Sequence, residues 1–514
     1  MWRFRSLKQI AASPQRFTGS WTGSQWRGPI RSITRASAPI SHHLYRRSRS
    51  ASAAAVLQPR ILQEQTRLPS EDMTADDLPI VSMDDRKVAI GWDTRTWSRF
   101  HHIWLRDHCR CPSCFHTVTK QRLVNTFEIP PDIQPLHVDA RVEGLEVTCG
   151  TVSHSSLSPL AEEMTGPSST PHVSLYPWSW LRHNSYDPPL HRPDNSTEKI
   201  LWGSKISQSP PIVRYEDVMT EDGFGLYKWL QNIDRFGFSF VSDVPVSPEA
   251  TEELVQRIGF IRETQYGKFW EFTSDLSKGD TAYTTLALGA HTDNTYFTDP
   301  CGLQLFHLLS HTDGSGGATL LVDGFYVASI LKEIHPDMYS LLSRIPIPTH
   351  AAGEQGSIYR PSPLSGYPVL NHDMLSRDLS QVRWNNDDRS AMRHLSGNDV
   401  EDWQVTRQLL YPHFPYPRYL RYNAIRKWHS LLTSPDSEYW VQLTPGTVVA
   451  INNHRVLHGR SAFDGKRRMC GAYVGIDEYR SRLAVLSEKF APDACYKLVE
   501  AKQDDIRSSW SPLI

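Results

Sequence analysis

The pattern of apolar and polar positions predicts a chain of many short strands and a few helices. Partly alternating apolar residues at 87–92 and 140–148, and apolar runs at 447–451 and 473–476, are typical of strands. The pair Ser247 and Pro248 is typical of a helix start, and the helical face that follows ends at Gly259. Its apolar positions are Ala250, Leu254, Val255 and Ile258. We therefore expect a mainly β fold with α-helices packed outside a barrel or sandwich core.

Polar, Pro-rich stretches divide the chain. Residues 153–170 are predicted to be an inserted surface loop, and residues 187–195 separate two units. The predicted organisation is a small β-rich unit at 78–190, a main domain at 200–480 and a C-terminal tail at 481–514. No apolar run approaches the roughly 18 residues that a membrane span requires, so no membrane partner is expected.

The charge is unevenly distributed. The 514 residues contain 55 Lys+Arg and 56 Asp+Glu. Residues 1–63 hold 11 of the basic residues and no acidic one, so the remainder of the chain has a net charge of −12. An Arg-rich, Ser-rich, acid-free leader is typical of a mitochondrial transit peptide and predicts a mitochondrial matrix protein. The alternative is a disordered basic arm that binds RNA. The net charge of −1 for the whole chain excludes a strongly basic nucleic-acid binder, and no nucleic-acid partner is expected.

Three cysteines predict a metal site. Cys109, Cys111 and Cys114 lie within six residues, and thiolates suit tetrahedral zinc, which requires a fourth ligand. The candidates for that ligand are His108, His116, Cys149 and His172. A zinc ion with four protein ligands would be structural. The alternative interpretation is that the three cysteines are reduced and unrelated to one another.

A second group of residues predicts an iron site. His291 and Asp293 follow the apolar run 286–290, and residues two apart on a strand point the same way. His458 follows the strand predicted at 447–451. Together the three residues would form the 2-His-1-carboxylate triad of non-haem Fe(II) oxygenases, which leaves coordination positions open. Because the chain has 22 His, an isolated His-x-Asp is weak evidence by itself.

Two basic residues strengthen this interpretation. Arg467 and Arg468 follow His458, and an oxygenase that uses 2-oxoglutarate needs an arginine to bind the distal carboxylate. The alternative is an ordinary solvated basic pair.

Several motifs, taken in order, resemble the γ-butyrobetaine/trimethyllysine dioxygenases. They lie between about residues 92 and 473 and are 266–270 (YGKFW), 280–285 (DTAYTT), 291–293 (HTD), 300–304 (PCGLQ), 321–325 (LVDGF) and 455–460 (RVLHGR). The resemblance implies a double-stranded β-helix (jelly-roll) catalytic domain, a small N-terminal zinc domain and a homodimer. It also implies Fe(II), 2-oxoglutarate and O2, with ascorbate supporting activity.

The resemblance also assigns residues. The zinc ligands would be Cys109, Cys111, Cys114 and His172; the iron ligands would be His291, Asp293 and His458; and Arg467 and Thr319 would bind 2-oxoglutarate. The aromatic residues assigned to a trimethylammonium cage are Tyr266, Trp270, Tyr283 and Tyr473. Aromatic faces hold such a cation by cation–π attraction, since it has no N–H to donate.

Asp280 favours one substrate over another. Nε-trimethyllysine carries an α-ammonium that a carboxylate pairs with, whereas γ-butyrobetaine has only a carboxylate, and the butyrobetaine enzymes place Asn at this position. Asn385, or its neighbour Asn386, would bind the α-carboxylate. The expected reaction is 3-hydroxylation of trimethyllysine, the first step of carnitine biosynthesis. The alternatives are γ-butyrobetaine hydroxylation and an inactive jelly-roll that binds methylated lysine.

Overall fold

The computed structural model describes most of the chain beyond its first 77 residues. The described ranges are 78–150, 171–190, 198–273, 284–353, 356–393, 424–490 and 509–510. The predictions made for the basic leader at 1–63, for the loop at 153–170 and for most of the tail lie outside these ranges. None of the helices in the described ranges is long and apolar enough to cross a membrane.

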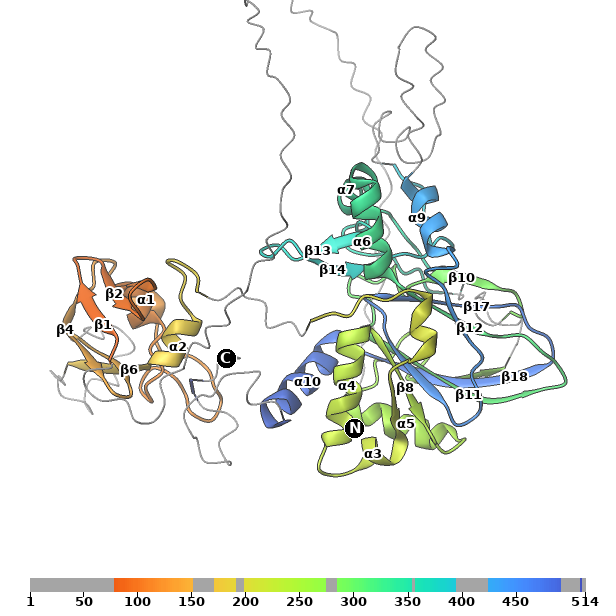
Figure 1. The fold of residues 1–514 in the computed structure, drawn as a ribbon, viewed down its shortest axis with the longest axis horizontal. Coiled ribbons are helices and arrows are strands. Elements are labelled where there is room, and N and C mark those ends of the chain that lie inside the picture. Colours follow the sequence, from red (N-terminus) through yellow and green to blue (C-terminus); the bar gives the residue numbers. More distant parts are fainter. Residues whose placement is uncertain are drawn as a thin grey trace, which may run out of the picture. The chain divides into compact units, whose positions relative to one another are not determined.

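The N-terminal part folds around two antiparallel three-stranded sheets. The first sheet has the order β1 (Ile80–Met83), β2 (Lys87–Gly91), β3 (Trp97–His101), and the second β4 (Pro135–Arg141), β5 (Gly144–Cys149), β6 (His172–Pro177). The helical elements are α1 (His102–Asp107), η2 (Thr126–Glu128) and α2 (Trp178–His183). Ile90 and Phe100 of the first sheet and Leu145 and Tyr176 of the second share one buried core. Both sheets therefore belong to one small domain (Figure 1).

The larger domain is a jelly-roll of two sheets. The six-stranded sheet has the order β7 (Ile212–Arg214), β8 (Phe238–Ser242), β16 (Val448–Asn452), β11 (Leu303–Thr312), β18 (Lys466–Val474), β9 (Phe269–Thr273). The four-stranded sheet has the order β10 (Leu288–His291), β17 (Val456–Arg460), β12 (Thr319–Asp323), β15 (Tyr439–Val441). These pairs are antiparallel except for β7 with β8.

Alternation along β16 explains how the sheets pack. Val449 and Ile451 point into a core shared with Leu321 of β12 in the other sheet, whereas Val448 and Ala450 point outward. Because successive strand residues face opposite sides, one strand supplies both the core between the sheets and the surface that the helices cover.

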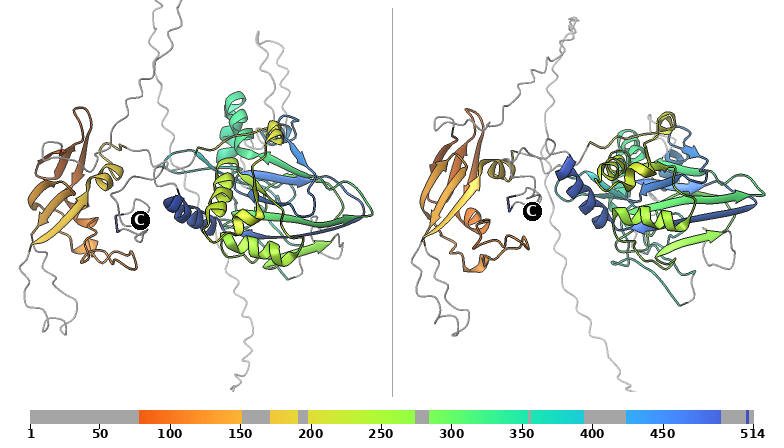
Figure 2. Two further views of the ribbon diagram at one scale, coloured as in Figure 1. Left: turned by 60° about the horizontal axis from the view of Figure 1, so that its bottom comes forward. Right: turned by 90° about the horizontal axis from the view of Figure 1, so that it is seen from below.

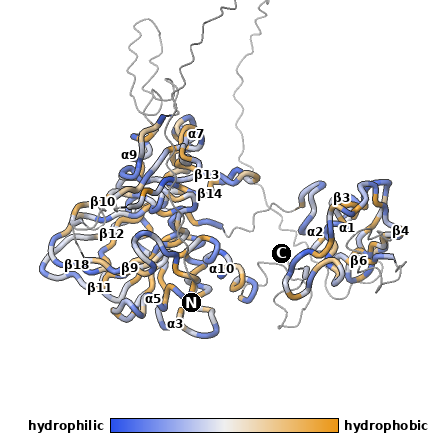
Figure 3. Tube along the Cα trace, turned by 180° about the vertical axis from the view of Figure 1, so that it is seen from behind, coloured by the Kyte–Doolittle hydropathy of each residue, from blue (hydrophilic) through white to orange (hydrophobic). Residues whose placement is uncertain are grey.

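Helices cover the outer faces of both sheets. The six-stranded sheet is covered by α3 (Tyr215–Met219), α4 (Phe224–Phe236), α5 (Pro248–Ile258) and α10 (Ile476–Phe490). The four-stranded sheet is covered by α6 (Gly324–Ile334), α7 (Pro336–Arg344), α9 (Ala424–Leu432) and the hairpin of β13 (Leu370–His372) and β14 (Leu379–Val382). Among the described residues, the remaining helical element is η3 (Ser204–Gln208). Figure 2 shows that the helices flank the strands, and Figure 3 shows the alternation of hydrophilic and hydrophobic residues along α5 and α7.

The predicted fold class, mainly β with helices outside, is confirmed. The helix predicted at 248–258 is α5, and the Ser247 hydroxyl accepts a hydrogen bond from the Ala250 N–H. The strand predicted at 473–476 is wrong at its end, because β18 stops at Val474 and Ile476 already begins α10. Asp477 and Glu478 lie in the first turn of α10, where carboxylates suit the helix dipole.

Candidate functional site

Sheet register brings the predicted iron ligands together. His291 of β10 lies directly opposite His458 of β17, so the two imidazoles stand on the same face, with ring centroids 4.4 Å apart. Asp293, two residues beyond His291, places its Oδ1 atom 3.3 Å from His291 Nε2 and 3.7 Å from His458 Nε2. His291 Nδ1 is 2.8 Å from the Gly289 carbonyl oxygen, so Nδ1–H can donate there and leave Nε2 to bind a metal ion. All three donor atoms lie within 4.8 Å of one another.

The electrostatics of the three side chains suit a cation. Burial opposes the charged form of His291, but the hydrogen bond and charge of Asp293 outweigh it and raise the pKa of His291 to about 9. Burial and the neighbouring His291 lower the pKa of His458 to about 3. Burial would raise the pKa of Asp293, yet the electrostatic interaction with His458 and the hydrogen bond from His291 hold it well below its usual range. An ionised carboxylate beside two imidazoles offers the donor set of a divalent iron site.

Three further residues hold Asp293 in place. Gln304 Nε2 and the Tyr473 hydroxyl both donate to Asp293 Oδ2, at 2.5 and 2.6 Å. Asn453 accepts from the Asp293 N–H at 2.8 Å and donates to its carbonyl at 3.0 Å. Sequence reasoning missed Gln304 and Asn453 as site residues, although both lie in or beside recognised motifs. Gln304 faces the interior because it alternates with the outward-facing Leu303 and Leu305, and that alternation was a usable signal.

A cavity of about 570 Å³ opens onto these residues. Arg467 and Thr319, the two residues predicted to bind 2-oxoglutarate, both line it and are both buried. Arg467 packs over the Phe463 ring at 5.4 Å, and burial together with neighbouring Arg460 lowers its pKa to about 10. Arg468 instead lies exposed, 2.5 Å from Glu271, so of the two adjacent arginines only Arg467 faces the cavity.

Arg460 is a cavity residue that sequence reasoning missed. It lies two residues after His458 on β17, so it shares the same face. Its Nη2 atom donates to the backbone carbonyls of Thr284 and Leu286, at 2.7 and 2.9 Å. The i and i+2 rule that paired His291 with Asp293 also places Arg460 beside His458.

Three of the four predicted cage residues line the same cavity. They are Tyr266, Trp270 and Tyr473, and the Trp270 and Tyr473 rings lie 6.2 Å apart. Tyr296, which sequence reasoning missed, is buried beside them with its hydroxyl 3.2 Å from that of Tyr266. Tyr283 lies outside the described residues.

Both asparagine candidates line the cavity. Asn385 is half-buried and its Oδ1 accepts from the Asp387 N–H at 3.0 Å, whereas Asn386 is exposed. The neighbouring Asp388 accepts a hydrogen bond from Thr295 at 2.9 Å. Asp280 lies outside the described residues.

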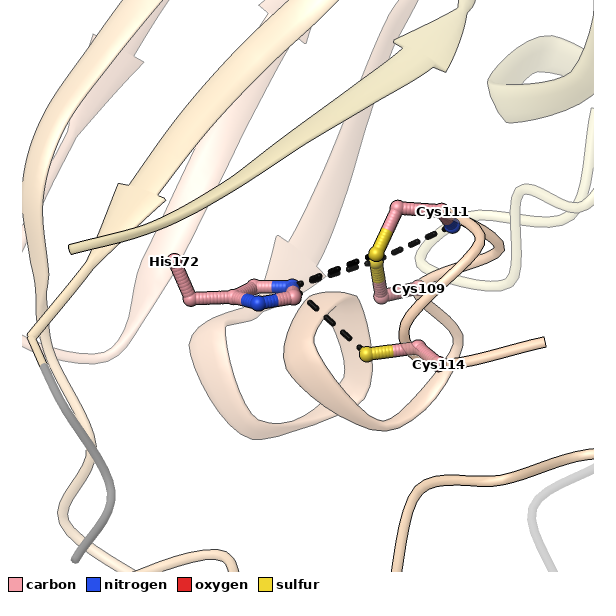
Figure 4. A group of neighbouring side chains, drawn as sticks. All are labelled: Cys109, Cys111, Cys114 and His172. Atoms are coloured by element: carbon pink, nitrogen blue, oxygen red, sulfur yellow. Dashed lines mark hydrogen bonds between the residues drawn. The ribbon is translucent and has the colours of Figure 1, made fainter. Parts of the chain in front are cut away.

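The cysteine cluster lies in the small domain. His172 Nε2, at the start of β6, is 3.4, 3.8 and 3.6 Å from the sulfurs of Cys109, Cys111 and Cys114 (Figure 4). All four donor atoms lie within 4.8 Å of one another. Of the four candidates for the fourth position, only His172 joins the thiols in that group.

The surroundings favour the thiolate of Cys114, whereas the hydrogen bond to Cys114 and burial raise the pKa of Cys109. Ser174 donates to Cys109 Sγ at 2.9 Å, and Arg106 to Cys114 Sγ at 3.2 Å. The hydrogen bond from Cys109, with further help from His172 and Arg106, lowers the pKa of Cys114 well below its ordinary value. Three cysteines and one histidine whose donor atoms lie this close together are a donor set that suits tetrahedral zinc.

Comparison with known proteins first defines the class. Residues 203–473 match the model of the taurine catabolism dioxygenase family TauD/TfdA, and residues 80–149 match that of gamma-butyrobetaine hydroxylase-like N-terminal domains. The chain is therefore an oxidoreductase of the TauD-like Fe(II)/2-oxoglutarate oxygenases, which act on small molecules and use Fe(II), 2-oxoglutarate and O2.

The relatives are more specific. Trimethyllysine dioxygenase of Meyerozyma guilliermondii is 39% identical over 81% of this chain and 98% of its own length. The mitochondrial trimethyllysine dioxygenase of Homo sapiens is 38% identical over 74% of this chain and 82% of its own. Gamma-butyrobetaine dioxygenase of a Pseudomonas species is 30% identical over 78% of this chain and 93% of its own length. The chain belongs to the trimethyllysine dioxygenase family.

Proposed function

We propose that this protein hydroxylates Nε-trimethyllysine at carbon 3, the first step of carnitine biosynthesis. One observation carries the proposal: an aromatic-lined cavity opens directly onto the His291, Asp293 and His458 cluster. A methylammonium group held against the aromatic faces fixes the position of the adjoining aliphatic chain relative to that cluster.

In this proposal His291, Asp293 and His458 bind Fe(II). When bound, the iron supplies the oxidation that couples decarboxylation of 2-oxoglutarate to insertion of oxygen into a C–H bond. Tyr473 and Gln304 hold the Asp293 carboxylate in one orientation through their hydrogen bonds.

Arg467 and Thr319 bind the distal carboxylate of 2-oxoglutarate. The guanidinium of Arg467 is buried, and its Nε atom has no hydrogen-bond partner among the described residues. A buried unpaired N–H is costly, so an anionic carboxylate that accepts from it is a fitting ligand.

Tyr266, Trp270, Tyr283 and Tyr473 form the cage for the trimethylammonium group. Tyr296 adds a fifth aromatic ring beside Tyr266 in the same cavity. Burial of Trp270, Tyr296 and Tyr473 keeps water away from the cation, which strengthens its attraction to the ring faces.

The opposite end of the substrate distinguishes trimethyllysine from γ-butyrobetaine. Asp280 pairs with the α-ammonium group, and Asn385 donates its amide to the α-carboxylate. The support for Asn385 over Asn386 is that Asn385 is the less exposed of the two.

The remaining features follow the same family pattern. Cys109, Cys111, Cys114 and His172 hold a structural zinc ion in an N-terminal domain at 78–190, next to an oxygenase domain at 200–480. Residues 1–63 direct the protein to the mitochondrial matrix and are removed there. The mature enzyme is a homodimer, and ascorbate keeps the iron reduced.

A competition assay tests the proposal. Chain lacking residues 1–63 is incubated in air with Fe(II), ascorbate, 2-oxoglutarate and equal amounts of trimethyllysine and γ-butyrobetaine. Mass spectrometry is expected to find one added oxygen on trimethyllysine, with the hydroxyl at carbon 3 and one succinate per product. Preferential oxidation of γ-butyrobetaine, or binding of trimethyllysine with no oxygen transfer, would contradict it. Asp280→Asn is expected to weaken use of trimethyllysine while leaving iron binding unchanged.

A further inference from the structure

The last described residues of the chain pack on the small N-terminal domain. The Trp510 indole meets Tyr176 and Trp180 edge to face, with ring centroids 5.6 and 5.1 Å apart and interplanar angles of 70° and 74°. Trp510 is half-buried against the core of that domain. Edge-to-face contacts with two rings are a favourable arrangement for an aromatic side chain.

A polar contact accompanies the edge-to-face contacts. Arg110 Nη1 donates to the Ser509 carbonyl at 2.8 Å, which fixes the backbone next to Trp510. The Arg110 guanidinium lies over the rings of Phe115, Trp180 and Trp510, at 5.4, 5.2 and 6.0 Å. One arginine thus binds the tail by a hydrogen bond and by cation–π contact at once.

Arg110 also belongs to the thiol-bearing loop. It stands between Cys109 and Cys111, whose sulfurs face His172. The tail contacts Arg110 in this loop, Tyr176 of β6 and Trp180 of α2, and Phe115, which follows the loop, packs against Arg110. We call this set the tail-docking face.

The tail connects the docking face to the other domain. It leaves the jelly-roll at the end of α10, whose Tyr479 and Leu486 are buried in the core of that domain. Eighteen residues separate Phe490 from Ser509. A chain of that length spans at most about 65 Å, so the C-terminus can reach a docking site well away from α10.

We propose that the C-terminal segment of this chain is a tether, and that Trp510 docks it onto the tail-docking face of the same molecule. The small domain is then joined to the jelly-roll twice, once by the chain that follows α2 and once by the tail. Because the tail is covalently attached, a modest contact is sufficient: the linker keeps Trp510 at a high local concentration. This inference rests on the fold alone and is independent of the proposed function.

Peptide binding tests the tether. The probe is a fluorescein-labelled peptide of residues 503–514, titrated into zinc-loaded full chain and into the same chain ending at residue 506. Fluorescence anisotropy is expected to show at least tenfold tighter binding to the shortened chain, whose docking face has lost its own tail. The Trp510→Ala peptide is expected to bind at least tenfold more weakly, and Trp510→Phe in between. Equal binding to both chains, or equal binding of the Ala peptide, would overturn the proposal.

Two controls keep the result specific. In the full chain, Trp510→Ala is expected to let the labelled peptide bind as it does to the shortened chain. Trp440→Ala, which removes an exposed tryptophan of β15, is expected to leave the peptide excluded. Light scattering of both chains identifies the molecule that receives the tail. Dissociation on loss of the tail would show that the tail is exchanged between two copies and would overturn docking within one molecule.

Discussion

The two clusters of metal-ligating side chains differ in how many donors they offer and in what lies beside them. The cysteine cluster of the small domain has four donors, Cys109, Cys111, Cys114 and His172, the full set for a tetrahedral ion. The His291, Asp293 and His458 cluster has three, and it borders a cavity of about 570 Å³. Donor number and access therefore separate a complete set of four donors from a set of three that leaves room for reactants.

The two clusters also differ in how far apart their donor residues lie in the sequence. The three cysteines lie on one short loop, and only His172 is distant. In the jelly-roll, the pairing of β10 with β17 brings His291 and His458 together, and Gln304, Tyr473 and Asn453 fix the carboxylate between them. A local change in the loop should thus affect the small domain, whereas a change in the jelly-roll cluster should affect chemistry without unfolding the sheet.

Removal of an iron ligand is expected to have the largest effect. We predict that His291→Ala lowers kcat/KM by roughly 10³-fold or more, because the iron contributes several kcal/mol to the reaction. Circular dichroism should remain unchanged, since His291 lies at the cavity rather than in the core. His137→Ala, at an exposed position of β4, is the matched control. Activity within tenfold of the parent after His291→Ala would exclude this residue as an essential ligand.

Loss of one thiol tests the other half of the comparison. Cys114→Ser is expected to reduce bound zinc from about one ion per chain to almost none and to unfold the small domain, because a structural zinc contributes directly to folding. Cys149→Ser alters a buried thiol of the same domain outside the donor group and should keep its zinc. Elemental analysis measures the zinc content of each variant, and thermal unfolding measures the stability of the small domain. Equal zinc content in the two variants would argue against the assigned donors.

The co-substrate arginine should show a smaller effect. Arg467→Ala is expected to raise the KM for 2-oxoglutarate by roughly 10- to 100-fold, the value of a buried charge-assisted pair of about 1.5–3 kcal/mol. Arg468→Ala removes an exposed pair with Glu271 and should change KM less than about twofold. Steady-state kinetics with varied 2-oxoglutarate distinguishes them. A larger effect for Arg468 than for Arg467 would reverse the assignment.

The smallest effect is expected at Tyr473, a proposed cage residue that also donates a hydrogen bond to Asp293. Tyr473→Phe keeps the ring but loses the 2.6 Å hydrogen bond to Asp293, so Fe(II) affinity should fall by about tenfold while the KM for trimethyllysine is kept. Tyr473→Leu should also raise that KM. Unaltered Fe(II) affinity in Tyr473→Phe would show that the hydrogen bond does not support the metal site.

Much of this was accessible from sequence because the motifs are local. The Cys109–Cys114 spacing, the His291–Asp293 pair and the helix start at Ser247 each depend on a few neighbouring residues. Arg467 was selected over Arg468 by its place in a motif, and the structure places only Arg467 at the cavity.

What sequence reasoning missed depends on distant contacts. Tyr296 joins the aromatic wall because its loop folds against Tyr266, and Asn453 reaches Asp293 across the fold. Neither contact follows from periodicity. The end of β18 was misjudged because Ile476 is apolar like the strand before it, although Asp477 and Glu478 suit a helix start.

Selective removal of the metals tests the central claim most directly. Purified chain is treated with a mild chelator under reducing conditions, and bound iron, bound zinc and trimethyllysine turnover are followed together. We predict that iron leaves first, that turnover falls in proportion and returns with Fe(II) alone, and that one zinc per chain stays bound throughout with the fold unchanged. Joint loss of both metals, or recovery of turnover that requires zinc, would contradict the division of the molecule into a four-donor zinc site and a three-donor iron site that is open to reactants.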